Sequence, residues 1–109
     1  MREKREDMIE IRQRLRIEYG DLHDKIQALL FRHDPIGINF ETNTDEYDPE
    51  VRTILPRLKS CHSVGAVRRM VHEEFVDWFG AEIAGEQEHY TQIGREIWEL
   101  WQQFTNAGG

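Results

Sequence analysis

Four carboxylates stand close together near the middle of the chain, at Asp45, Glu46, Asp48 and Glu50. Clustered oxygen ligands would suit calcium, but the segment lacks a glycine at the sixth loop position and a bidentate glutamate at the twelfth. Nothing in the pattern selects two of these acids as a pair for glycoside hydrolysis. We therefore interpret them as acids that cap a helix, and as a patch that faces a partner protein.

The histidines of the sequence do not belong to a complete metal-ligand motif. The segment Glu86–His89 has the Glu-x-x-His spacing of di-iron bundles, but the chain has no second copy of it. His72 is not followed by the second histidine that a zincin requires. Because the ligand sets are incomplete, we predict no metal and no other cofactor.

Nucleophilic chemistry also lacks a motif. Cys61 and His62 are adjacent in sequence, whereas catalytic Cys–His pairs are normally brought together by the fold. The chain has no glycine-rich phosphate loop, serine elbow or dinucleotide fingerprint. We predict that the protein is not an enzyme, and a small enzyme with an unrecognised site remains an alternative.

The aromatic residues at helical spacing are typical of core positions, and Trp98 is the exception. It lies about 100° around the helix from Ile97 and widens the apolar arc beyond what one core needs. Tryptophan is enriched at protein interfaces. We therefore expect Trp98 at a partner contact or at the seam of a structural oligomer.

The elements that position these residues follow from apolar spacing. Apolar residues recur at steps of three and four, and this spacing continues in phase through Gly20. It favours one long helix, straight or bent at Gly20, because an interior glycine costs only about 1 kcal/mol relative to alanine. Pro35 ends that helix, and Ile36, Ile38 and Phe40 then alternate as an extended apolar segment. The expected elements are a helix over 2–32, a loop over 33–48, and helices over 49–59, 64–79 and 86–104.

Capping residues set the expected helix ends. Asp48 is expected as N-cap, with Pro49 at the first helical position and Glu50 in the first turn. Pro56 predicts a kink or an end to that helix. Ser63 is expected to begin the third helix and Gly80 to end it. The sequence thus predicts an all-α, single-domain bundle of about four helices, with a long first helix and an extended apolar segment in the first connection.

The net charge and its distribution along the chain indicate which kinds of partner the protein binds. The chain of 109 residues carries a net charge of −7, whereas a nucleic-acid binder usually has a basic excess. Residues 21–50 hold two basic and eight acidic side chains, and residues 81–109 hold one and five. One cysteine and no apolar run of membrane-spanning length favour a cytoplasmic protein without a membrane partner.

Three segments together resemble a signature of small, mostly uncharacterised bacterial helical proteins. They are Asp34-Pro35-Ile36-Gly37, the stretch from Asp45 to Val51, and the stretch from Glu73 to Gly80. Those proteins often have Trp at the position of His33, and the signature carries no known catalytic residue. Some proteins of this kind are immunity partners of secreted toxins, so the resemblance implies a bacterial protein that binds another protein.

We predict a small acidic protein-binding module, in the form of an immunity or inhibitor-type protein that neutralises a basic partner. The expected contact residues are Asp45, Glu46, Asp48, Glu50 and Trp98. The alternative from another class is a DNA-mimic inhibitor of a nucleic-acid enzyme, which would need carboxylates spaced like phosphates along one face.

Overall fold

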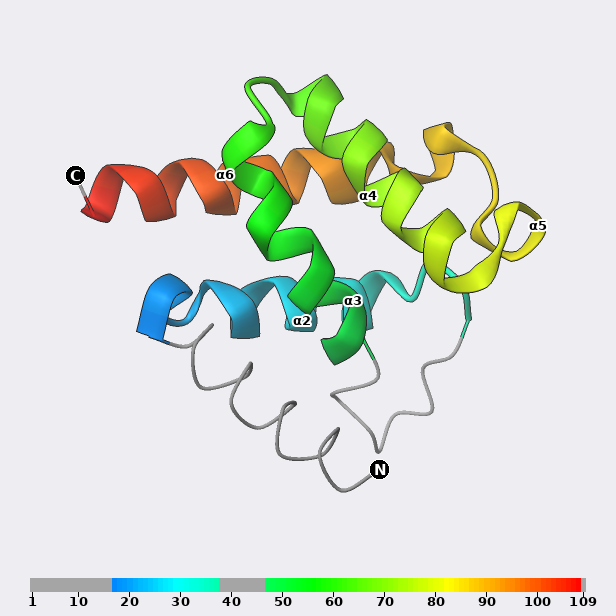
Figure 1. Ribbon diagram of the computed structural model, residues 1–109, viewed down its shortest axis with the longest axis horizontal. Coiled ribbons are helices and arrows are strands. Elements are labelled where there is room, and N and C mark those ends of the chain that lie inside the picture. Colours follow the sequence, from blue (N-terminus) through cyan, green and yellow to red (C-terminus); the bar gives the residue numbers. More distant parts are fainter. Residues whose placement is uncertain (1–16, 38–46, 109) are drawn as a thin grey trace.

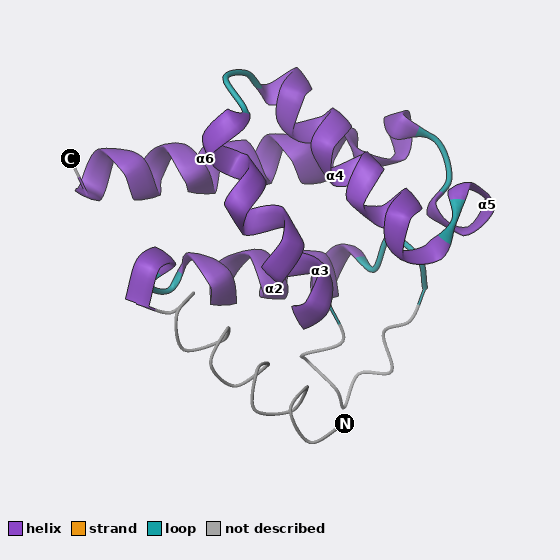
Figure 2. Cartoon of the chain, viewed as in Figure 1, coloured by secondary structure: helices purple, strands orange, loops and turns teal. Residues whose placement is uncertain are grey.

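The computed structural model describes residues 17–37 and 47–108 of the chain, and this part consists of helices joined by turns and loops, without a strand (Figures 1 and 2). Its elements are α2 (Leu22–His33), α3 (Asp48–Ile54), the 3₁₀ helix η1 (Leu55–Ser60), α4 (Val64–Phe79), α5 (Ala81–Ala84), the 3₁₀ helix η2 (Gln87–Tyr90) and α6 (Thr91–Gly108). The all-α class is therefore confirmed. The expected bundle of four helices is not, because the described residues divide into more and shorter elements.

The helix expected over 2–32 is interrupted at Gly20. Residues 17–19 are helical, Gly20 and Asp21 form a turn, and α2 begins at Leu22. Gly20 has a φ of +56°, which lies in the left-handed region and cannot continue a right-handed helix. Tyr19 and Leu22 are nevertheless both buried. The turn thus keeps the apolar stripe in phase, which explains why apolar spacing alone does not reveal it.

The end of α2 agrees with the prediction from Pro35. The helix ends at His33, and Asp34 adopts a left-handed conformation with φ +49° while its N–H donates to the carbonyl of Leu30. The hydroxyl of Tyr47 donates to Oδ1 of Asp34 over 2.7 Å, so this bond ties together the two ends of the connection between α2 and α3. Ile36 packs against the core as expected. Ile38, Phe40 and the rest of the expected extended segment lie outside the described residues.

Pro56 divides the second expected helix. The α-helix α3 ends at Ile54 and continues as the 3₁₀ helix η1, which relieves the clash between a proline ring and the preceding helical turn. The N-terminal prediction is displaced by one residue. Tyr47 is the N-cap of α3, and Asp48 is already the first helical residue.

Helix α4 has the predicted bounds. The side chain of Ser63 accepts a hydrogen bond from the N–H of Ala66 over 3.1 Å, and Gly80 ends the helix with a φ of +87°. The short helix α5 was not expected. The hydroxyl of Tyr90 holds its end by donating to the carbonyl of Ala84 over 2.6 Å. Together, η2 and α6 replace the helix expected over 86–104.

Helices α2 and α6 lie side by side and antiparallel, and α3 with η1 leads from α2 to the start of α4 (Figure 1). Helix α4 packs closely on α6 at Gly94, where an added Cβ would lie 2.9 Å from Cα of Arg68. Phe75 of α4 is fully buried in the core between Tyr47 and Tyr90, at ring-centroid distances of 6.0 and 5.3 Å. None of the helices formed by the described residues is long and apolar enough to span a membrane.

Candidate functional site

The structure describes only two of the four acids in the predicted acidic patch. Asp45 and Glu46 lie outside the described residues. Asp48 and Glu50 are interior residues with only 4 % and 3 % of their surface exposed. The expectation that these two carboxylates face a partner is therefore corrected, because both side chains are buried.

Asp48 is held by basic groups from two helices. Its Oδ1 lies 2.8 Å from Nε2 of His23 on α2, and its Oδ2 lies 3.1 Å from Nε of Arg52, one turn further along α3. The hydrogen bond to Asp48 raises the pKa of His23, burial acts in the opposite direction, and Asp24 adds a smaller upward effect. A buried charge is tolerated only when it is paired. This ion pair accordingly fastens α2 to α3.

Trp98 lies at the edge of the core. It is partly buried and packs against the buried cluster, together with Leu100, Trp101 and Phe104 of the same helix. The broad apolar arc of α6 is thus real, but most of it covers the interior. Trp98 itself is neither fully buried nor fully exposed, and its role at a partner contact stays a prediction.

The histidines with described contacts act as ties between segments. Nε2 of His89 donates to the carbonyl of Pro35, and Nε2 of His72 donates to the carbonyl of Gly85, each over 2.8 Å. Within residues 17–37 and 47–108, no three His, Cys, Asp or Glu side chains are grouped so that they could hold a metal ion.

Cys61 is a buried thiol, and burial raises its pKa. A raised pKa disfavours the thiolate, which is the nucleophilic form. Its neighbour Arg57 is engaged by two carboxylates of α4, with 2.7 Å to Oε1 of Glu73 and 2.7 Å to Oε2 of Glu74. This region therefore ties η1 to α4, and burial keeps the thiol of Cys61 in its less nucleophilic form.

A different set of acids is on the surface. Helix α4 ends at the short helix α5, and the chain returns through η2 to α6 (Figure 1). Trp78 and Ile83 are large apolar residues in this region, and 44 % and 60 % of their surfaces are exposed. We call the exposed acidic and large apolar residues of this region the acidic corner, and they are Asp77, Trp78, Glu82, Ile83, Glu86 and Glu88.

The sequence contains a signal for the acidic corner that motif analysis misses. Residues 70–94 include no lysine and no arginine, although they include six acidic residues. This absence is a property of composition over a window and has no characteristic spacing, so no motif reports it. Exposure of Ile83 additionally depends on the unexpected helix α5.

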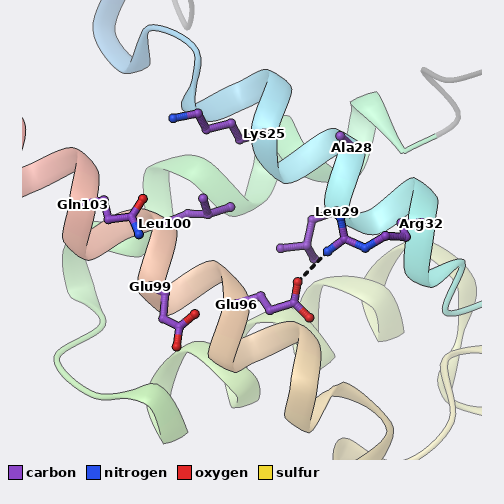
Figure 3. Close-up of a pocket in the computed structure, with 8 residues that line it drawn as sticks. All are labelled: Lys25, Ala28, Leu29, Arg32, Glu96, Glu99, Leu100 and Gln103. Carbon is purple, nitrogen blue, oxygen red and sulfur yellow. Dashed lines mark hydrogen bonds and ion pairs between the residues drawn. The ribbon is translucent and has the colours of Figure 1, made fainter.

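A groove between α2 and α6 is the second surface feature, with a volume of about 350 Å³. Figure 3 shows Lys25, Ala28 and Arg32 on the α2 side, Glu96, Glu99 and Gln103 on the α6 side, and the side chains of Leu29 and Leu100 between the helices. The groove therefore has positive residues along α2, negative residues along α6, and apolar side chains at its base.

Glu96 fastens one end of this groove. Its Oε1 accepts from Arg32 over 2.6 Å and its Oε2 accepts from His33 over 2.8 Å, with Gln92 as a further donor. Partial burial acts to raise the pKa of Glu96, but the hydrogen bonds from His33 and Gln92 and the charge of Arg32 outweigh it, so the pKa is lowered. The two helices are thereby held in one register.

Comparison with protein-family models, with curated proteins and with solved structures finds no match for this chain. The resemblance to small bacterial helical proteins stays a prediction, and the case for a function depends on the surfaces described above.

Proposed function

We propose that the chain is a protein-binding module that recognises a basic partner protein through the acidic corner. The observation that carries this proposal is the position of two exposed apolar side chains, Trp78 and Ile83, among four exposed carboxylates. Protein interfaces commonly combine a few apolar or aromatic anchors with a polar rim, and tryptophan is enriched among the anchors.

Several described acids outside the corner are used in ion pairs within the fold. Glu18, Glu73, Glu74 and Glu96 each pair with a lysine, arginine or histidine of the chain. Among the ion pairs of the described residues, none engages the carboxylates of the acidic corner. Their charge is therefore fully available to an external cation.

The side chain of Trp78 is already oriented in the free protein. Its Nε1 donates to Oγ1 of Thr53 on α3 over 3.1 Å, although much of the ring faces solvent. A preorganised anchor loses little conformational entropy on binding, which favours affinity. The surrounding negative charge would accelerate encounter with a basic surface.

In its concrete form, the module is an immunity or inhibitor-type protein that covers a basic surface of its target. This proposal keeps the predicted recognition of a basic partner by carboxylates but assigns it to different carboxylates. The contact moves from the acids before and within α3 to those at the end of α4 and in the segment that follows. Two of the originally expected acids, Asp48 and Glu50, are needed inside the fold.

A basic amphipathic peptide with leucines flanked by lysine and arginine is a suitable probe, with calorimetry as the measurement. We expect the variant Glu82→Gln/Glu86→Gln to bind it about tenfold more weakly, about 1.4 kcal/mol, at low salt. The variant Glu18→Gln/Asp21→Asn removes the same charge from exposed positions elsewhere and should bind almost like the unchanged protein. Equal weakening in both variants would show that net charge, and not the acidic corner, attracts the peptide.

A further inference from the structure

We infer that the groove between α2 and α6 is a self-association surface that takes the same groove of a second copy of this chain. The inference is independent of the acidic corner, because residues of α2 and α6 line this groove and none of them belongs to the corner. It begins from the spacing of charged residues on the two helices.

Both helices expose the same pattern toward the groove. On α2, the outward residues Lys25, Ala28 and Arg32 follow the spacing i, i+3, i+7, and on α6 Glu96, Glu99 and Gln103 follow it again. This spacing gives one straight line along each helix. Among these six residues, the charges on the α2 line are positive and those on the α6 line are negative, so this section of the groove is divided lengthwise by sign. Asp21, which lies before α2 and lines the next section, pairs with Lys25 over 3.6 Å.

The internal ion pair fixes how the two lines are aligned. Arg32 contacts Glu96 over 2.6 Å, and the helices are antiparallel. One helical turn away, Ala28 is therefore level with Glu99, and after a further turn Lys25 is level with Gln103. The groove continues past this point to Leu22 and Phe104, which line its second section.

Two-fold symmetry then selects one arrangement of two copies. An axis that runs along the groove lays α2 of each copy over α6 of the other, so each positive line meets a negative line. An axis across the groove would instead lay α2 on α2 and α6 on α6, so like charges would meet. Symmetric dimers use one self-complementary surface twice, and only the first arrangement makes this surface complementary to itself.

The small side chain of Ala28 allows the two copies to approach each other closely. In the favoured arrangement, Glu99 of the second copy comes opposite Ala28, the smallest side chain on the α2 line. Its carboxylate then lies between Lys25 and Arg32, whose side chains are 53 % and 64 % exposed in the single chain. The apolar floor at Leu29 and Leu100 is covered at the same time. Two helices from each copy make a small interface, so we expect a weak, concentration-dependent dimer.

Sedimentation velocity of the full chain at low salt, from low to high micromolar concentration, tests this. We expect the unchanged protein to dimerise and both Lys25→Glu and Glu99→Lys to stay monomeric. A one-to-one mixture of the two variants should dimerise again, because each copy then offers the charge that the other lacks. Recovery in the mixture requires contact between copies and does not arise from repair within one chain.

Ala28→Glu is a further test variant, and it leaves all other residues of the groove unchanged. It sets a carboxylate against Glu99 of the second copy and should also abolish dimerisation, while circular dichroism shows the same helical content. A protein that remains monomeric at every concentration overturns the inference. Dimers that persist in both single charge variants overturn it as well, because the seam would then lie elsewhere.

Discussion

Nε2 of His23 lies 2.8 Å from Oδ1 of Asp48, and both side chains are almost fully buried. This contact joins α2 to α3 across the connection that contains Asp45 and Glu46. It determines which acids of the central segment are free to act at the surface. Asp48 belongs to the interior, whereas the carboxylates of the acidic corner are exposed.

The His23–Asp48 pair predicts a specific dependence of stability on pH. The hydrogen bond to Asp48 raises the pKa of His23 above its value in the unfolded chain, despite burial. The protonated histidine therefore stabilises the fold fully below about pH 6.5, its ordinary pKa, and this contribution is lost as the pH rises through the folded-state pKa. Chemical denaturation at a series of pH values should show it.

Asp48→Asn should lower the free energy of unfolding by about 2 kcal/mol at acidic pH, because it removes a hydrogen bond between charged groups. The dependence on pH above about 6.5 should also become flatter. Asp77→Asn, at an exposed position, is the matched control and should stay within about 0.5 kcal/mol of the parent. An identical pH dependence in the parent and in Asp48→Asn would contradict the assigned role of this pair.

Gly20 allows a prediction whose sign depends on the fold. Its φ is +56° and an added Cβ would meet nothing within 4 Å, so only backbone strain opposes a side chain there. We expect Gly20→Ala to lower the free energy of unfolding by about 1 kcal/mol. Gly20→Asn should lose less, because asparagine tolerates the left-handed region better. If one helix ran through Gly20, alanine would instead stabilise the protein by about 1 kcal/mol.

Gly94 tests the contact between α4 and α6. A Cβ at this position would lie 2.9 Å from both Cα and Cβ of Arg68, and backbone of a packed helix cannot give way cheaply. Gly94→Ala should therefore lower the free energy of unfolding by about 1 to 3 kcal/mol. Gly65→Ala is the matched change in α4, where the nearest atom is Ser63 Oγ at 3.9 Å, and it should be neutral or stabilising. Thermal or chemical unfolding of the two variants makes the comparison.

Local signals in the sequence were sufficient where a helix end is defined by its own residues. Ser63 and Gly80 mark the ends of α4, Pro35 marks the end of α2, and Pro56 marks the change from α3 to η1. These predictions hold because capping and proline effects act within one helical turn. The break at Gly20 did not follow from them, since the turn preserves the phase of the apolar stripe.

The candidate site depended on contacts that local signals do not contain. Asp48 and Glu50 have the position and charge of ordinary first-turn acids. The pair between Asp48 and Arg52 is local, four residues apart on α3, but the contact between Asp48 and His23 of α2 is tertiary. The acidic corner arises because Gly80 and Gly85, both with positive φ, enclose the short helix α5 and leave Ile83 exposed. Neither result could be derived from spacing alone.

The most direct test of the proposed function is a map of backbone and indole N–H signals by NMR during titration with the basic amphipathic peptide. Binding at the acidic corner predicts that the changes concentrate at residues 77–88 and at the indole N–H of Trp78, and that Glu82→Gln/Glu86→Gln abolishes most of them. Changes confined to other parts of the surface, with an unaffected Trp78 indole, would contradict the proposal.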